Sequence, residues 1–420
     1  MKYFLICISV IAISMFYFPF EFTFLKGINT KHMLAGFGLL CLGGHIVLER
    51  SLSFTKELII ASGLATIFSV WCFFATDYNR TDDYAYSGYI GSMWIWFLAC
   101  YGACILVAFT HGYISVKLIV YYLLSVCVLQ CCLALMIEFN AGFKNIIDRI
   151  FVTGDLEFME KVGRLYGVGA LLDVAGGRFS AVLAMTSVIL MDSEEVRKSV
   201  KIMLLLIIGF FIVSVVGNMI ARTTSIGVGL GLMYIFLKSE ILAIAISKKS
   251  IRLWLVFVSS VVVMVLIAIF LYKTYPEVTS LMRFAFEGFF NWVETGTWET
   301  SSTEVLQSMW VFPDNDKTWL IGDGYFNDPI TGSFYKYTDV GYLRFTYYSG
   351  LIGLILFSIF FIYLTIALGN RFCFYRSIFN LLLIIVFVNW LKVSTDIFLV
   401  YAFFLVISQP YFLKYYYRAE

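Results

Sequence analysis

Three arginines, Arg178, Arg222 and Arg344, each stand at the start of an apolar stretch, in GGRFSAV, ARTTSIG and GYLRFTYYSG. A helix that begins at such a position adds unpaired N–H groups and partial positive charge to the guanidinium. This arrangement is unfavourable unless an anion binds, and the arginine fork fits phosphate oxygens. The sequence therefore predicts a binding site for a phosphate-type anion, with Arg164 and Arg283 as weaker candidates.

Arg222 lies in a segment without acidic residues and is the only charged residue from Ile202 to Leu237. Its expected partner is an anion from outside the chain. The alternative is an interfacial arginine that extends its charged head to water or fixes the topology. That alternative suffices for each arginine taken alone.

If a hydroxyl group reacts at such an anion site, it needs a carboxylate as a base or orienting group. Asp339, five residues before Arg344, is the first candidate, and Asp323 and Asp173 are the others. A turn or a helix cap is an alternative role for each. One further pair, Asp314 and Asp316, could hold a divalent metal, but its position next to a proline favours a turn. We expect no metal ion and no cofactor.

The composition defines the class of protein that carries these residues. The chain has 420 residues, of which 61% are hydrophobic and 14% are charged, whereas a soluble domain has about 25% charged residues. The sequence therefore predicts a polytopic membrane protein. The net charge of +2 indicates no particular partner, and we expect no nucleic acid to bind. The nine cysteines form no C-x-x-C pair, which favours free thiols packed as small hydrophobes.

A scan for apolar stretches long enough to cross a bilayer predicts an all-α fold with about twelve (11–13) transmembrane helices in one integral membrane domain, 1–420. The predicted spans are 3–20, 33–48, 57–76, 89–109, 114–137, 179–191, 202–221, 223–237, 253–272, 344–368, 378–394 and 396–413. Glycines at 227, 229 and 231 predict close helix packing in the eighth span.

Lysine and arginine in the short loops set the orientation. One set of loops is rich in them, and both termini belong to that set, so we expect both termini in the cytoplasm. Two long loops, 139–178 and 273–343, then lie on the outer face, together with the three arginines. Three cations on the face that usually avoids them favour a functional site.

The spans after Arg178 and Arg222 are short, at about 20 and 22 Å, against about 30 Å of hydrocarbon. These arginines therefore lie in a recess, unless the helices continue toward the cytoplasm. Each long loop also contains an amphipathic stretch, FKNIIDRIFV and MRFAFEGFFNWVE. Each stretch predicts a helix that lies in the outer headgroup region or caps the bundle.

Residues 322–357, GDGYFNDPITGSFYKYTDVGYLRFTYYSGLIGLILF, resemble the signature that closes the last large periplasmic loop of the O-antigen polymerase (Wzy) family. The shared pattern is Gly-x-Gly, a variable stretch, Asp-x-Gly-Tyr-x-Arg and an aromatic-rich span with Gly-x-x-Gly. NMIARTTSIGVGLGL resembles the arginine–threonine turn of that family, and GGRFSA resembles its earlier periplasmic arginine.

The resemblance implies an enzyme of the bacterial inner membrane with two periplasmic loops. It would transfer a growing glycan from undecaprenyl pyrophosphate to a new lipid-linked repeat unit, in lipopolysaccharide or similar polysaccharide synthesis. Arg164, Arg178, Arg222 and Arg344 would bind the pyrophosphate, and Arg222 and Arg344 would act with Asp339 in catalysis. Trp310, Tyr325 and Tyr342 are candidate glycan contacts. Expected partners are lipid-linked glycans, membrane lipids and a protein that regulates chain length.

Two alternatives stay open. O-antigen ligases of the wider polymerase/ligase group usually carry a histidine near the position of Asp339, and this chain has none there. A lipid-linked oligosaccharide flippase or transporter would need charges spread through a central cavity and balanced halves. In this chain the charges gather on one face and no internal repeat is evident, which counts against a flippase or transporter. The missing histidine counts against a ligase, so the polymerase is favoured over both alternatives.

Overall fold

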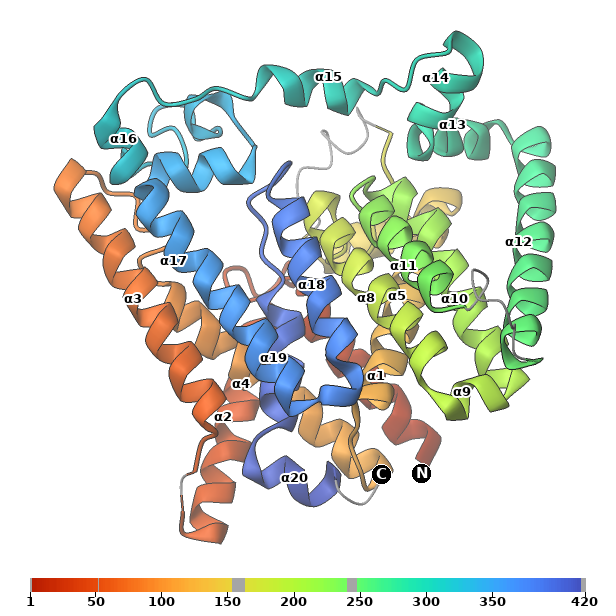
Figure 1. Ribbon diagram of the computed structural model, residues 1–420, viewed down its shortest axis with the longest axis horizontal. Coiled ribbons are helices and arrows are strands. Elements are labelled where there is room, and N and C mark those ends of the chain that lie inside the picture. The colour runs from red at the N-terminus through yellow and green to blue at the C-terminus, as the bar shows by residue number, and fades with distance from the viewer. Residues whose placement is uncertain (1, 52, 153–162, 240–247, 417–420) are drawn as a thin grey trace. The chain divides into compact units, whose positions relative to one another are not determined.

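The computed structural model describes residues 2–51, 53–152, 163–239 and 248–416 (Figure 1). These residues fold into helices joined by turns. The described chain has no named strand, and its three isolated bridges pair Glu21 with Asn29, Phe22 with Phe151 and Asn327 with Phe334. Eight described helices are long and apolar enough to cross a membrane. The predicted all-α membrane class is confirmed. Each predicted span overlaps a described helix, and four apolar helices are shorter: Lys2–Tyr17, Thr224–Lys238, Cys373–Asn389 and Phe398–Ile407.

Contacts divide the chain, which the sequence analysis treats as one domain, into two compact units. Unit 1 contains Met1–Leu34 and Ala103–Trp298, and unit 2 contains Ala35–Gly102 and Glu299–Tyr417. The division falls within α2 (Thr30–Glu49) and α4 (Tyr89–His111).

Unit 1 contains both predicted amphipathic stretches and most of the first eight predicted spans. Its other helices are α1 (Lys2–Tyr17), α5 (Val116–Phe139), α6 (Ala141–Ile150), α8 (Leu172–Asp192), α9 (Glu194–Lys198), α10 (Val200–Ile220), α11 (Thr224–Lys238), α12 (Lys248–Thr274), α13 (Pro276–Ala285) and α14 (Glu287–Thr295). Its centre is α8, which packs against α5, α10 and α11 (Figure 1).

Glycines bring α8 and α11 into close contact. A Cβ atom at Gly227 would collide with the backbone of Ser180, and one at Gly231 would meet the Ser187 hydroxyl at 2.5 Å. The Ser180 hydroxyl also accepts a hydrogen bond from Gly227 N–H at 3.1 Å. The predicted small-residue packing is confirmed at these two glycines, whereas Gly229 faces open space.

Helix α8 differs from the prediction in its length. It begins at Leu172 and has 21 residues, which span about 31 Å, so it is not a short helix that starts after Arg178. The predicted first loop, 139–178, ends seven residues early, at residue 171, and Arg178 lies inside the helix. Hydropathy missed this part because Asp173, Gly176 and Gly177 lower it, although the two glycines are buried by protein.

The amphipathic stretches form helices, but the second is not continuous. FKNIIDRIFV lies in α6, whose Ile147 packs against Ile137 and Tyr166. MRFAFEGFFNWVE is divided between α13 and α14, which are separated at Phe286 (φ −118°, ψ 30°). The expectation of one helix is therefore wrong here. Two helices that meet at an angle can place residues on either side of the joint against one partner.

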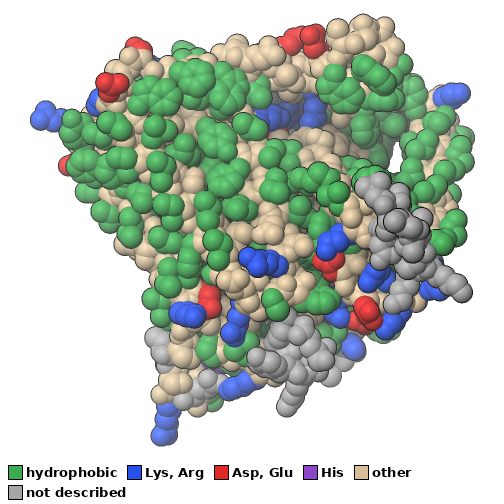
Figure 2. All heavy atoms as spheres, viewed as in Figure 1, with side chains coloured by type: hydrophobic (Ala, Val, Ile, Leu, Met, Phe, Trp, Pro, Cys, Tyr) green, Lys and Arg blue, Asp and Glu red, His purple; other side chains and the backbone are tan. Residues whose placement is uncertain are grey.

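Helix α12 leaves many of its apolar side chains exposed and most of the others partly exposed, as Figure 2 shows along its outer side. Residues on several faces contribute, including Leu255, Val258, Val262, Leu266 and Phe270. In water such a surface would be strongly unfavourable, so this helix is suited to contact with lipid.

Unit 2 contains the remaining helices: α3 (Lys56–Asn79), α15 (Ser301–Ser308), α16 (Asp316–Leu320), the 3₁₀ turn η1 (Tyr335–Tyr337), α17 (Gly341–Arg371), the 3₁₀ turn η2 (Cys373–Tyr375), α18 (Arg376–Asn389), α19 (Phe398–Ile407) and α20 (Pro410–Tyr416). Helix α17 packs along α3 and α18 (Figure 1). The Phe68 and Phe357 rings stack between α3 and α17 at 4.5 Å.

Helix α17 is broken at Gly350, whose φ of 68° and ψ of −178° are open almost only to glycine. A break in a helix frees the carbonyls of the preceding turn, which need other donors. Three donors from outside the helix meet them: Asp323 N–H on Tyr347 (2.5 Å), Gly324 N–H on Tyr348 (3.2 Å) and the Trp71 indole on Ser349 (2.8 Å).

Candidate functional site

Arg222 lies in the tight turn between α10 and α11 in unit 1. The Thr224 hydroxyl donates to Gly217 O at 3.0 Å, and the Ser180 hydroxyl donates to Thr223 O at 2.8 Å. Thr223 and Thr224 are almost fully buried. The turn is therefore fixed on both sides, and it holds the Arg222 backbone in one place.

The Arg222 side chain contacts the joint between α13 and α14, in the second long loop. Its Nη1 lies 2.6 Å from Glu287 Oε2, and its Nε donates to Phe284 O at 3.0 Å. Its Cζ lies 4.2 Å from the centre of the Phe284 ring. The sequence predicts that an anion from outside the chain pairs with Arg222, but the structure already pairs it with a carboxylate of the chain itself. Glu287, 65 residues along the chain, supplies the missing carboxylate.

A second arginine reaches the same ring from the first long loop. Arg164 Cζ lies 5.3 Å from the centre of the Phe284 ring, and the next residue, Leu165, donates its N–H to Met219 O on α10 at 3.2 Å. Arg164 Nε is buried and has no hydrogen-bond partner in the structure as described. We call Arg164, Arg222, Phe284 and Glu287 the arginine cluster.

In the arginine cluster, burial and the neighbouring carboxylate act in opposite directions on the charged form of Arg222. Burial lowers the pKa of Arg222, the nearby charge of Arg164 adds to the lowering, and Glu287 opposes it. Two guanidinium groups close to one ring repel each other, although each gains some cation–π attraction. A buried donor without a partner is also costly. An anion that accepts from both arginines would relieve both penalties.

Asp173 lies beside the arginine cluster. Its Oδ1 accepts a hydrogen bond from the Thr223 hydroxyl at 3.2 Å, and its charge acts on Arg222. Of the three carboxylates considered as a base, it is the one in the same unit as Arg222.

Arg178 lies within α8 and is 8% exposed. Its Cζ lies 5.8 Å from the centre of the Phe18 ring, and its carbonyl accepts a hydrogen bond from the Tyr17 hydroxyl at 2.9 Å. Because the helix begins six residues earlier, Arg178 does not add its charge to a helix N-terminus, which corrects the expectation from the sequence.

Arg344 lies in unit 2 near the start of α17 and is 7% exposed. Four acceptors from three segments hold its two terminal nitrogens: Asp339 Oδ1 (3.3 Å), Ser394 Oγ (3.2 Å), Phe326 O (3.2 Å) and Asn327 Oδ1 (3.1 Å). Its Cζ also lies 3.7 Å from the centre of the Phe326 ring. The chain itself thus provides partners for both terminal nitrogens, and Asp339, 25% exposed, is one of them. Arg344 Nε, like that of Arg164, is buried without a hydrogen-bond partner in the described structure.

Asp83 supports this arrangement from the loop after α3. Its Oδ2 accepts the N–H groups of Phe326 at 2.7 Å and Asn327 at 3.1 Å. The same two residues present their oxygens to Arg344. The contact joins the loop after α3, the end of the second long loop and α17 within unit 2.

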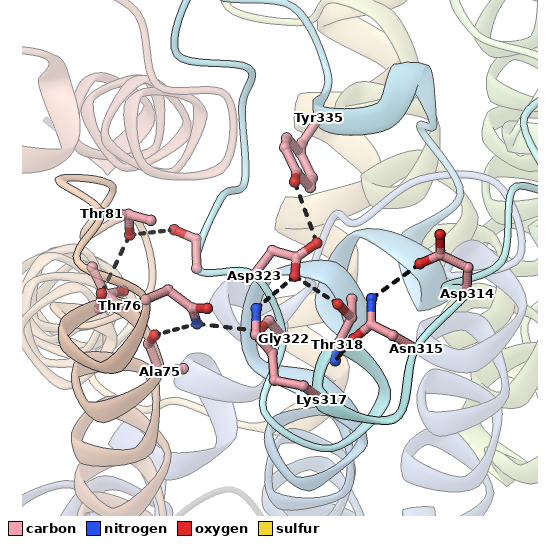
Figure 3. A network of polar contacts seen from close by, with 12 residues as sticks. Ala75, Thr76, Thr81, Asp314, Asn315, Lys317, Thr318, Gly322, Asp323 and Tyr335 are labelled. Carbon is pink, nitrogen blue, oxygen red and sulfur yellow. Dashed lines mark hydrogen bonds and ion pairs between the residues drawn. The ribbon is translucent and has the colours of Figure 1, made fainter.

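Asp323 is the centre of the network in Figure 3. Its carboxylate accepts hydrogen bonds from Lys317 Nζ at 2.9 Å, from the Thr318 hydroxyl at 2.6 Å and from the Tyr335 hydroxyl at 3.3 Å. Gly324 O accepts from Thr81 at 2.8 Å. Asn79, the last residue of α3, also donates to Gly322 O at 3.1 Å. The Gly-Asp-Gly segment therefore fixes the loop to the end of α3 and to the break in α17, and the role of Asp323 matches the turn-forming alternative.

The three aromatic candidates for glycan contact differ in their surroundings. Trp310 is 37% exposed and lies near Phe312. The Tyr325 ring lies 5.4 Å from that of Tyr335, and both are half-buried. Tyr342 donates its hydroxyl to Phe387 O at 2.9 Å, so it joins α17 to α18.

The Asp314 and Asp316 pair lies in a capping turn. Asn315 between them accepts the Thr318 N–H at 2.8 Å and caps α16, and its amide donates to Asp314 at 3.0 Å. In the described ranges no three His, Cys, Asp or Glu side chains gather as a metal site would require.

The structure thus brings Arg164, Arg222 and Asp173 together in unit 1, and Arg344 and Asp339 together in unit 2. Sequence reasoning missed Phe284 and Glu287. The available signal was an acidic residue within an amphipathic stretch of a long loop, which is too weak to identify a partner.

Comparison of the chain with models of protein families, with curated proteins and with solved structures found no match.

Proposed function

We propose that this chain is a membrane-embedded polysaccharide polymerase that joins lipid-linked oligosaccharide repeat units. The observation that carries the proposal is the arginine cluster, in which two long loops and the α10–α11 turn bring two guanidinium groups to one ring. Arg164 keeps a buried donor unsatisfied there. The signature residues that resemble the O-antigen polymerases support the choice of reaction.

The chemistry follows from the charge that develops on the leaving group. Cleavage of a glycosyl–pyrophosphate bond places negative charge on the pyrophosphate, and preorganised cations in a site poor in water stabilise it strongly. Arg222 and Arg164 would bind the phosphate oxygens. Arg178, which lies in the same unit, would act on the same group, as proposed from the sequence.

The acceptor hydroxyl requires a carboxylate. Asp339 remains our first candidate because it is partly exposed while Arg344 orients it. Asp173 is the alternative, because it lies beside the turn that carries Arg222.

The proposed setting is the bacterial inner membrane, with about twelve spans, both termini in the cytoplasm and the two long loops in the periplasm. Helix α11 has 15 residues and extends about 22 Å, less than the hydrocarbon thickness of about 30 Å. Its length favours a recessed position for Arg222. The partners would be undecaprenyl-pyrophosphate-linked glycans and a chain-length regulator.

Deletion of the gene in its native strain, followed by gel analysis of lipopolysaccharide, tests the proposal. A polymerase predicts core molecules that carry a single repeat unit, with the ladder restored by the wild-type gene. Bare core would instead indicate the ligase or flippase alternative. An unchanged ladder would contradict all three.

A further inference from the structure

The proposed reaction gives no role to Glu287, although this residue contacts Arg222. It is the first residue of α14, and its carboxylate contacts Nη1 of Arg222. The side chains of Glu287 and Arg222 are 25% and 15% exposed, respectively. Because water reaches this ion pair only partly, the carboxylate is a real competitor for any other anion.

Arg222 also holds the end of the preceding helix. Phe284 O belongs to the last turn of α13, where carbonyls lack partners within the helix, and Arg222 Nε donates to it. One guanidinium therefore binds both sides of the joint at Phe286. The Glu287 contact is the part that an anion would replace, because it uses a terminal nitrogen.

We propose that Glu287 is a specificity-determining residue that occupies the anion-binding edge of Arg222 until an anion with more charge than a carboxylate displaces it. This inference rests on the proposed function. A pyrophosphate group offers several oxygens and more than one negative charge, and Arg164 can bind it as well. A monovalent anion gains too little to replace a carboxylate that the chain already positions.

The chain contains a matched control. Arg283 on α13 and Glu294 on α14 form a second Arg–Glu ion pair, with both side chains about half exposed. That pair also bridges α13 and α14, but it lies outside the arginine cluster. A change of Glu294 therefore removes an equal charge and an Arg–Glu ion pair from the same helix, α14.

The experiment measures the Kd of inorganic pyrophosphate by calorimetry on the full-length protein in nanodiscs. We expect Glu287→Gln to lower the Kd of pyrophosphate about threefold to tenfold. The variant removes the carboxylate that competes for Arg222, and the loss of such an ion pair changes a binding constant by roughly one order of magnitude or less. Glu287→Asp, which keeps the charge, and Glu294→Gln should bind like the wild type. Arg222→Ala should lose binding.

The outcomes separate the two proposals. If Arg222→Ala binds as the wild type does, the anion site of the proposed function is wrong and the role of Glu287 is overturned with it. If Arg222→Ala loses binding while Glu287→Gln binds equally or more weakly, the anion site stands and the inference about Glu287 is overturned. Thermal unfolding of each variant verifies the fold, and if the glutamine variant unfolds, Glu287→Ala, which also removes the carboxylate, is measured in its place with the same expected decrease in Kd.

Discussion

Replacement of Arg344 by methionine should destabilise unit 2 rather than only abolish activity. The change removes four hydrogen bonds from a side chain that is 7% exposed. Loss of one partner from a buried charge pair costs about 3–5 kcal/mol. Because Asp339 is 25% exposed and can regain water, we expect a smaller loss of about 2–4 kcal/mol.

For a unit of this size that loss corresponds to a fall of about 5–15 °C in the unfolding midpoint. The assay is thermal unfolding of the purified protein in nanodiscs, with limited proteolysis of the loop around Asn327 as a local readout. Arg283→Met is the control, since Arg283 forms an exposed pair that should contribute less than about 1 kcal/mol.

If Arg344→Met and Arg283→Met melt alike and show the same proteolysis pattern, Arg344 does not clamp the loop. In that case the reasoning from its contacts is refuted, and a role restricted to the substrate would account for the residue better.

Three further predictions concern glycine packing, the α17 break and the second arginine. Gly227→Ala should destabilise the protein by about 1–3 kcal/mol in thermal unfolding because it collides with Ser180, whereas Gly229→Ala, which faces open space, should stabilise it by about 0.5–1 kcal/mol. Gly350→Ala should cost about 1–3 kcal/mol, since alanine rarely adopts its φ of 68°; a normal midpoint would disprove the strain. Arg164→Ala should weaken binding of inorganic pyrophosphate about tenfold, and an unchanged Kd would remove Arg164 from the site.

The helices were the predictable part of the fold, because an apolar run of about 20 residues rarely forms anything but a helix that crosses a membrane. Helix α8 shows the limit of this reasoning. Its first two turns contain Asp173 and two glycines and have the composition of a loop, but from Ala175 onward the helix is buried by protein, so this part needs no lipid-compatible surface. Hydropathy cannot distinguish a helix start buried by protein from a polar loop.

The candidate site was predictable in its residue types and not in its partners. The sequence singled out Arg222 because a cation is rare in such a segment. Its carboxylate partner, Glu287, is 65 residues away, and only the fold brings the joint of α13 and α14 to the α10–α11 turn. The pattern around Arg344 was likewise visible, but the four acceptors that hold it come from three segments.

The break in α17 accounts for part of the sequence signature physically. Gly350 interrupts the helix, and the backbone of Asp323 and Gly324 satisfies the carbonyls that the break frees. The Gly-x-Gly element therefore has a structural task in this chain. No rule of hydropathy or helix propensity couples two segments that lie about 26 residues apart.

The most direct test of the central claim is the polysaccharide ladder made by Arg222→Ala in the deletion strain. We predict that the variant is inserted in the membrane at the wild-type level and yields only single repeat units, because the leaving pyrophosphate loses its principal cation. Arg222→Lys should also extend chains poorly, since a point charge replaces the fork. A full-length ladder from Arg222→Ala would contradict the account.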